Sequence, residues 1–179
     1  MQELKQVFEA IAAAGLWRPG PVLKRGEYLI LPGQRDRNLY YIERGTVVAT
    51  LQIEEEEQCM RFGYAGDIVA AVDNLIVDGP SRFAIRALRR TTLSAVGLAD
   101  YRSLFRSGAL DGVWEATLEW LIQGYMEREI DLLTPSPEAR YRRVLERSPR
   151  LFQEVPAKYI ANYLRMTPET LSRLKKGAG

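Results

Sequence analysis

The spacing of hydrophobic positions changes twice along the chain, from helical to strand-like and back to helical. In residues 2–15 apolar side chains recur every three or four positions, which predicts an amphipathic opening helix that ends at Gly15. Short β-rich segments follow from Gly20, each bounded by Gly, Pro or Asp, and such a series is typical of an antiparallel roll or barrel. Strands are expected at residues 28–31, 39–42, 47–53, 58–64, 68–69, 83–87 and 92–96.

Turn residues indicate where this roll changes direction. Pro32-Gly33 and Arg44-Gly45 mark two tight corners, because glycine supplies the positive φ that such turns require. The acidic run 54–57 stands between two strand-like segments. It is interpreted as a solvated hairpin loop and not as a metal site.

A long helical pattern follows the roll, from residue 98 to about residue 133, with an interruption near Ser107-Gly108. Its apolar stripe keeps coiled-coil spacing for about three turns. The stripe either packs on the roll or forms a seam between two chains, and the seam is the favoured interpretation. The stripe residues are Leu110, Trp114, Leu118, Leu121 and Tyr125, and Ile130 extends it.

Two prolines end this long helix. The segment 134–137, with the sequence Thr-Pro-Ser-Pro, is expected to serve as a hinge or linker. Ser136 then caps a further helix over roughly residues 138–146. The small core expected around that helix contains Tyr141, Val144, Leu145, Leu151 and Phe152.

Two short helical patterns stand back to back near the C-terminus. The first has Ile160 and Leu164 on one face. The second starts after Thr167, a good N-cap residue, with Pro168 at the first helical position, where proline costs no hydrogen bond. Two short helices joined by a tight turn, the second one basic, form a helix-turn-helix DNA-binding unit. Helical hairpins also occur in ordinary bundles, so this segment alone leaves DNA binding open.

Charge is distributed unevenly along the 179 residues. Residues 135–179 hold ten Lys or Arg against four Glu, whereas the rest of the chain holds 15 basic and 19 acidic residues. A basic C-terminal third on an acidic body suits contact with nucleic-acid phosphates. A generic solubilising surface is the alternative, and the coincidence with the helix-turn-helix disfavours it.

The residue types that are missing limit the chemistry of the protein. The chain has no histidine and one cysteine, Cys59, which excludes Ser-His-Asp and Cys-His catalysis, His-ligated metals and multi-cysteine clusters within one chain. We therefore predict no catalytic residue and no metal ligand, and do not expect an enzyme. The N-terminus lacks a signal-peptide pattern, and no apolar run approaches the ~20 residues of a membrane span, so a cytoplasmic location is expected.

Four stretches of the sequence carry a family resemblance. They are LKRGEYLILPGQRDRNLYYIERGTV at residues 23–47, Gly66-Asp67, PSRFAIRAL at residues 80–88, and VPAKYIANYLRMTPETLSRLKK at residues 155–176. The first resembles a cyclic-nucleotide-binding roll and the last a DNA-reading helix. Together they resemble the Crp/Fnr superfamily of bacterial transcription regulators, and among these the short, histidine-poor members common in Bacteroidetes.

The resemblance implies an α+β fold in three parts. Residues 1–107 would form an effector domain, an antiparallel β-roll like those that bind cyclic nucleotides. Residues 108–134 would form a central dimerisation helix, and residues 135–179 a helix-turn-helix DNA-binding domain.

The resemblance also implies an effector pocket between the roll and a short internal helix. In nucleotide-binding members a Gly-Glu-Leu stretch contacts the ribose, and an Arg-Ser pair with backbone N–H groups holds the cyclic phosphate. Here Gly66-Asp67-Ile68 stands near the first place (another register puts the acid near Asp73), and Ser81 and Arg82 stand at the second. Because a one-residue slip turns a strand side chain to the opposite face, Arg82 is expected at the surface. We therefore do not expect cyclic AMP or cyclic GMP to bind, and an unknown small-molecule effector stays open.

At the DNA end the resemblance implies that the first turns of the second helix reach base edges. Glu169 could accept from a cytosine and Arg173 could donate to a guanine, and their spacing of four also allows them to pair. Pro168 departs from members that have a base-reading arginine there, and Arg165 replaces the glycine common in the turn. The residues expected to contact DNA are Thr167, Glu169, Thr170, Ser172, Arg173, Lys175 and Lys176.

The expected partners are double-stranded DNA, a second copy of the chain and RNA polymerase. We hypothesise that an effector or partner biases the central helix and the hinge at residues 134–137, and so re-aims the recognition helices. Two alternatives remain: a constitutive DNA binder with a ligand-free roll, and a small-molecule sensor that acts through protein contacts.

Overall fold

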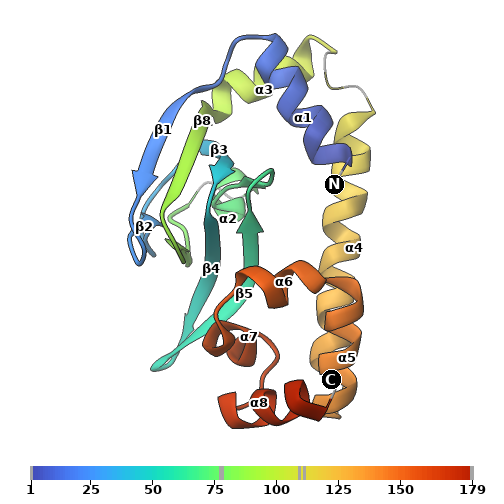
Figure 1. The fold of residues 1–179 in the computed structure, drawn as a ribbon. Coiled ribbons are helices and arrows are strands. Elements are labelled where there is room, and N and C mark those ends of the chain that lie inside the picture. The colour runs from blue at the N-terminus through green and yellow to red at the C-terminus, as the bar shows by residue number, and fades with distance from the viewer. Residues whose placement is uncertain (1, 77–78, 109, 111, 178–179) are drawn as a thin grey trace.

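The strands of the described residues lie between residues 18 and 97, with one helix before them, a short helix among them and further helices after them (Figure 1). The structure, a computed structural model, describes residues 2–76, 79–108, 110 and 112–177. All seven predicted strands form, each within two residues of the expected ends. The strands are β1 Arg18–Leu23, β2 Tyr28–Ile30, β3 Asn38–Arg44, β4 Thr46–Ile53, β5 Glu56–Tyr64, β6 Ile68–Val69, β7 Phe83–Ala87 and β8 Thr91–Gly97.

The strands form two antiparallel sheets, with the orders β1-β8-β3-β6 and β2-β7-β4-β5. The sheets face each other over a core that contains Ile42, Val47 and Leu93, each at most 1% exposed. The corner at Gly45 has a φ of 108°, and a Cβ there would collide with Thr91, so this turn requires glycine. The antiparallel roll expected from the sequence is therefore present.

The strand β1, with the sequence RPGPVL, was not predicted. Two prolines argue against a strand in a sheet interior, because proline cannot donate to the hydrogen-bond ladder. β1 lies at the edge of its sheet and pairs only with β8, with a register shift between Pro19 and Val22. An edge position and a bulge are the two places where a strand tolerates proline.

Helices pack at the end of the roll that carries the N-terminus. α1 (Gln2–Ala13) and α3 (Leu98–Arg106) share a core that contains Val7, Ile11 and Leu98. Leu110 lies in this core at 1% exposure and precedes the central helix α4 (Val113–Leu133). Its assignment to the dimer stripe was wrong, because the break in the helix turns this leucine inward.

Five shorter helices complete the described part of the chain: α2 Val72–Ile76, α5 Pro137–Arg147, α6 Pro149–Glu154, α7 Ala157–Tyr163 and α8 Pro168–Gly177. The predicted cap is present, since Ser136 Oγ accepts a hydrogen bond from the Ala139 N–H at 3.3 Å. The sequence analysis did not predict α6, whose six residues are too few to show a helical period.

One strand of the roll is covered on both faces. Val47 and Val48 of β4 are 1% and 0% exposed, although neighbouring strand residues point to opposite faces. Val47 packs inside the roll, whereas Val48 belongs to a second core made mainly by α5 to α8. The C-terminal helices therefore pack on the outer face of the β4–β5 pair.

The described residues contain neither a membrane-spanning helix nor a cluster of metal-ligating side chains. No helix in this part of the chain is long and apolar enough to cross a membrane. No group of three or more His, Cys, Asp or Glu side chains in it could hold a metal ion.

Candidate nucleic-acid interface and effector pocket

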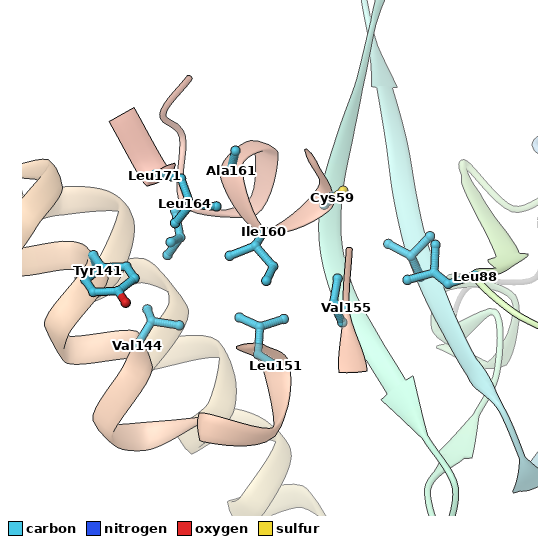
Figure 2. Close-up of a cluster of buried hydrophobic side chains, with 11 residues drawn as sticks. Cys59, Leu88, Tyr141, Val144, Leu151, Val155, Ile160, Ala161, Leu164 and Leu171 are labelled. Atoms are coloured by element: carbon cyan, nitrogen blue, oxygen red, sulfur yellow. The ribbon is translucent and has the colours of Figure 1, made fainter. Parts of the chain in front are cut away.

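The helices α7 and α8 form a helix-turn-helix around a closed core. Ile160, Leu164 and Leu171 are at most 1% exposed and meet beneath the two helices (Figure 2). Thr167 caps α8, because its Oγ1 accepts from the Thr170 N–H at 3.2 Å. Pro168 is the first residue of α8, as the sequence predicts.

The turn between these helices is fixed by a buried arginine. Arg165 adopts a left-handed conformation with φ 53°, which costs energy for a residue with a side chain. Arg140 of α5 is 7% exposed and donates from Nε to the Leu164 carbonyl at 2.7 Å and from Nη2 to the Arg165 carbonyl at 3.2 Å. Its Nη1 donates to the Thr134 carbonyl at 2.6 Å. One guanidinium thus holds the left-handed turn and ties it to the end of α4.

The solvent face of α8 carries most of the residues predicted to contact DNA. Glu169, Ser172, Arg173 and Lys176 are exposed and, with Pro168, line a shallow hollow of about 540 Å³. Thr167 and Lys175 are also exposed, and Thr170 is half-buried. The helix therefore brings four of the seven predicted residues, Glu169, Ser172, Arg173 and Lys176, onto one accessible surface.

The Glu169 carboxylate accepts hydrogen bonds at the start of its own helix. The pKa of its carboxyl is lowered, because the carboxylate accepts hydrogen bonds from its own backbone N–H and from Thr167 at the start of α8. No ion pair joins Glu169 to Arg173 in the described part of the chain. Arg173 is thus the exposed cation in the middle of the α8 face.

The predicted effector residues separate into two groups. Gly66 and Asp67 form the turn between β5 and β6, where Asp67 Oδ2 accepts from the Tyr64 N–H at 2.8 Å. Burial raises the pKa of the Asp67 carboxyl, although this N–H bond acts in the opposite direction. Ile68 is half-buried in β6. These three residues therefore belong to a turn and the strand that follows it. The Oδ2 atom of Asp67 is already bonded to the Tyr64 N–H and does not face a ligand.

Ser81 and Arg82 both contact one carboxylate, that of Asp73. Asp73 of α2 accepts from the Arg82 N–H at 2.7 Å and from Ser81 Oγ at 3.0 Å. Ser81 is 2% exposed, whereas Arg82 is exposed with its guanidinium 5.7 Å from the Phe83 ring centre. The Asp73 carboxylate therefore already accepts from the Arg82 N–H, the backbone donor next to Ser81.

Comparison with known proteins agrees with this geometry. The profile described as "Cyclic nucleotide-binding domain" matches residues 22–107. Residues 22–107 belong to that domain family. No curated protein matches the sequence.

The whole chain, including this cyclic nucleotide-binding domain, has the fold of full-length Crp/Fnr regulators. It is similar to FixK2 from Bradyrhizobium japonicum, with a TM-score of 0.73 and 19% identity over 90% of this chain and 83% of that one. The regulator CLP of Xanthomonas campestris gives a TM-score of 0.69 and 14% identity over 97% and 91%. The catabolite activator protein of Thermus thermophilus gives 0.56 and 20% identity over 97% and 82%.

The cyclic nucleotide-binding domain is followed by a central helix with an exposed apolar seam. Along α4, exposed apolar side chains recur every three or four residues at Ile122 (56%), Met126 (58%), Ile130 (43%) and Leu133 (72%). Of the predicted stripe, Tyr125 is 49% exposed beneath the Arg61 guanidinium, 4.0 Å from its ring centre. Leu118 and Leu121 are half-buried, and the Trp114 side chain lies outside the described residues. The accessible seam thus runs beside the predicted stripe.

Several of the basic residues counted in the C-terminal third are paired with carboxylates of the protein itself. Asp131 of α4 is fully buried and binds Arg143 Nε at 2.9 Å and Arg147 Nη2 at 2.5 Å. Arg150 pairs with Glu154 at 2.5 Å. The charge count therefore overstated the cationic surface.

One further functional residue was missed by sequence reasoning. Arg140 stands four residues before Val144, on the apolar face of α5, and a lone cation at that position was the available signal. Asp73 was named only as an alternative place for the pocket acid, and its carboxylate accepts from Ser81 and Arg82.

Proposed function

We propose that this protein is a sequence-specific DNA-binding transcription regulator that acts in the cytoplasm as a homodimer. The observation that carries the proposal is the exposed polar and basic face of α8, mounted on a rigid helix-turn-helix. The similarity of the fold to FixK2 and CLP supports the arrangement of roll, central helix and helix-turn-helix.

The residues of α8 would divide the work of recognition. Arg173 can donate two hydrogen bonds to a guanine, and Ser172 and Thr170 can contact neighbouring base edges. Glu169 would accept from a cytosine only after leaving the N-terminus of its own helix. Thr167, Lys175 and Lys176 would contact phosphates, which position the helix without reading sequence.

Dimerisation would follow from the seam on α4. Exposed apolar side chains at coiled-coil spacing favour pairing with a second copy of the same helix. A two-fold axis along α4 would place two α8 helices about 34 Å apart, in successive major grooves. RNA polymerase would be a further partner of the DNA-bound dimer.

We further propose that the roll does not take a cyclic nucleotide. The Asp73 carboxylate accepts from the Arg82 N–H and from Ser81 Oγ, so a phosphate would have to displace a neighbouring anion. This contact favours a roll that holds no cyclic nucleotide. CLP is described as responsive to c-di-GMP, and that property is CLP's own. An unknown effector and a sensor that acts through protein contacts remain as alternatives. The salt series below tests the sensor, because DNA binding without phosphate contacts would depend little on salt.

The test is equilibrium binding to labelled duplexes from the protein's own upstream regions, followed by fluorescence anisotropy across a salt series. We expect binding that weakens steeply with salt and that Arg173→Ala reduces about tenfold or more. Arg106→Ala removes the same charge from the far end of the molecule and should bind as the wild type does. Binding that responds to cyclic AMP would contradict the ligand-free roll, and equal loss in both variants would contradict a specific role for Arg173.

A further inference from the structure

The DNA-binding module is clasped to an open strand edge of the roll. β5 is the last strand of its sheet, so its outer N–H and C=O groups lack a strand partner. Asn162 of α7 supplies two bonds to this edge: its Oδ1 accepts from the Cys59 N–H at 2.7 Å and its Nδ2 donates to the Glu57 carbonyl at 2.9 Å. One side-chain amide thus takes the place of a neighbouring strand.

Apolar and charged contacts extend this clasp along the interface. Figure 2 shows Cys59 of β5 and Leu88 of the roll on one side of a shared core, with Val155 and Ile160 between them and α5. Arg150 Nη2 donates to the Ala65 carbonyl at 3.1 Å, and Thr46 Oγ1 donates to Glu154 at 3.1 Å. The contact therefore involves both α6 and α7 of the module.

The clasp also engages the turn of the helix-turn-helix. Arg165 Nη1 donates to Gln58 Oε1 of β5. Arg165, Gln58 and the acidic hairpin residues Glu54, Glu55 and Glu56 line one hollow of about 640 Å³. The Arg165 guanidinium, next to α8, is therefore hydrogen-bonded to the roll, and the carboxylates of the hairpin lie beside it.

We propose that this docked arrangement is an autoinhibited state of the DNA-binding module. The inference rests on the proposed DNA-binding function. Phosphates that approach the turn before α8 would meet the carboxylates of the hairpin, and like charges repel. Release of the clasp would carry the hairpin away and free Arg165 for a phosphate, so any partner that pulls α7 from β5 would raise DNA affinity.

The single cysteine reports the state of the clasp without DNA. Cys59 is 5% exposed beneath α7, and burial raises its thiol pKa to about 12. A buried neutral thiol reacts slowly with maleimide, because the thiolate is the nucleophile. Undocking would expose the thiol and return its pKa toward the ordinary value near 8.5, so the labelling rate at pH 8 measures release.

Two variants of the full chain separate the effect of the clasp from the effect of the acidic hairpin. Asn162→Ala removes both bonds to β5, and we expect at least about fivefold faster labelling of Cys59 together with at least about fivefold tighter DNA binding at low salt. Glu54→Gln/Glu55→Gln leaves the clasp in place, so we expect unchanged labelling and tighter DNA binding. This second variant changes exposed residues only and keeps the proposal testable if Asn162→Ala fails to fold. The charge-matched control is Glu9→Gln/Asp100→Asn, on α1 and α3 at the other end of the molecule (Figure 1).

The outcomes are distinct. Faster labelling of Asn162→Ala with unchanged DNA affinity would overturn autoinhibition and leave the clasp a structural contact. Equal effects of the hairpin variant and its control would overturn a local role of the hairpin carboxylates. If wild type and variants all fail to bind DNA at any salt concentration while labelling responds to Asn162→Ala, the proposed DNA-binding function itself fails.

Discussion

At the scale of single residues, several side chains that look like functional groups in the sequence serve the fold instead. Arg140 and Arg143 contribute to the basic C-terminal count, yet one holds the helix-turn-helix turn and the other binds buried Asp131. Sequence reasoning cannot separate such residues from surface cations, because both have the same charge and only tertiary contacts distinguish them. It did find Thr167 and Ser136, because a helix cap depends on residues within one turn.

Asp73 provides a first residue-scale prediction. Asp73→Ala leaves the Arg82 N–H and Ser81 Oγ without their carboxylate, and should lower the free energy of unfolding by about 2 kcal/mol in urea titrations. Asp73→Asn keeps one acceptor oxygen and should lose less. Wild-type protein should show no rise in thermal midpoint with cyclic AMP, and a clear rise would contradict the role assigned to Asp73.

Cys59 provides a second prediction, on alkaline stability. Because burial raises its pKa in the folded state to about 12, its contribution to stability is complete below the unfolded pKa near 8.5 and declines as pH rises toward 12. Stability should therefore decrease above pH 9, with Cys59 contributing at most about 1.4 kcal/mol per pH unit. Cys59→Ala should have a shallower slope over that interval. An identical slope in both proteins would mean that the thiol stays accessible in the folded state.

At the scale of elements, local patterns were sufficient for most helices and strands and insufficient for a few. Seven strands follow from alternating apolar residues between turn signals, which is information held within the segment. β1 was missed because its prolines are acceptable only at the sheet edge it occupies, and edge position is a property of the whole sheet. The break before α4 was predicted, but its effect on Leu110 was not, since the direction of a side chain after a break depends on the tertiary path.

A buried ion-pair cluster joins α4 to α5, and its contribution to the free energy of unfolding can be measured. Asp131 is fully buried and binds both Arg143 and Arg147, so its charge is compensated across the connection between α4 and α5. Asp131→Asn leaves two partly buried cations without that carboxylate and should cost about 3 kcal/mol of unfolding free energy. Arg143→Ala keeps the pair with Arg147 and should cost less. A loss below that of Arg143→Ala would show that Asp131 is not the centre of this contact.

At the scale of the whole molecule, the order of roll, central helix and helix-turn-helix was predicted from motifs, but the packing of the last part on the first was not. The contact between Asn162 and β5 joins residues more than a hundred positions apart, and each is unremarkable in its own segment. The apolar pair Val47-Val48 was the available signal, because a strand exposed on one face would alternate.

The seam on α4 gives the prediction for assembly. Met126→Asp places a charge in the exposed apolar seam and should convert a dimer to a monomer in sedimentation experiments, with weaker binding to two-half-site DNA. Gln153→Asp, an exposed change on α6 that adds the same charge outside the seam, is the matched control and should remain dimeric. Dissociation in both variants would indicate a general effect of added negative charge, and dissociation in neither would place the dimer contact elsewhere.

Selection of bound duplexes from a random library, with wild-type protein and Arg173→Ala, tests whether α8 reads DNA as part of a symmetric dimer. We expect an enriched sequence of two inverted half-sites, about 10 base pairs apart from centre to centre, with a guanine preference that Arg173→Ala loses. Binding without any enriched sequence, or an enriched site that Arg173→Ala leaves unchanged, would contradict this expectation.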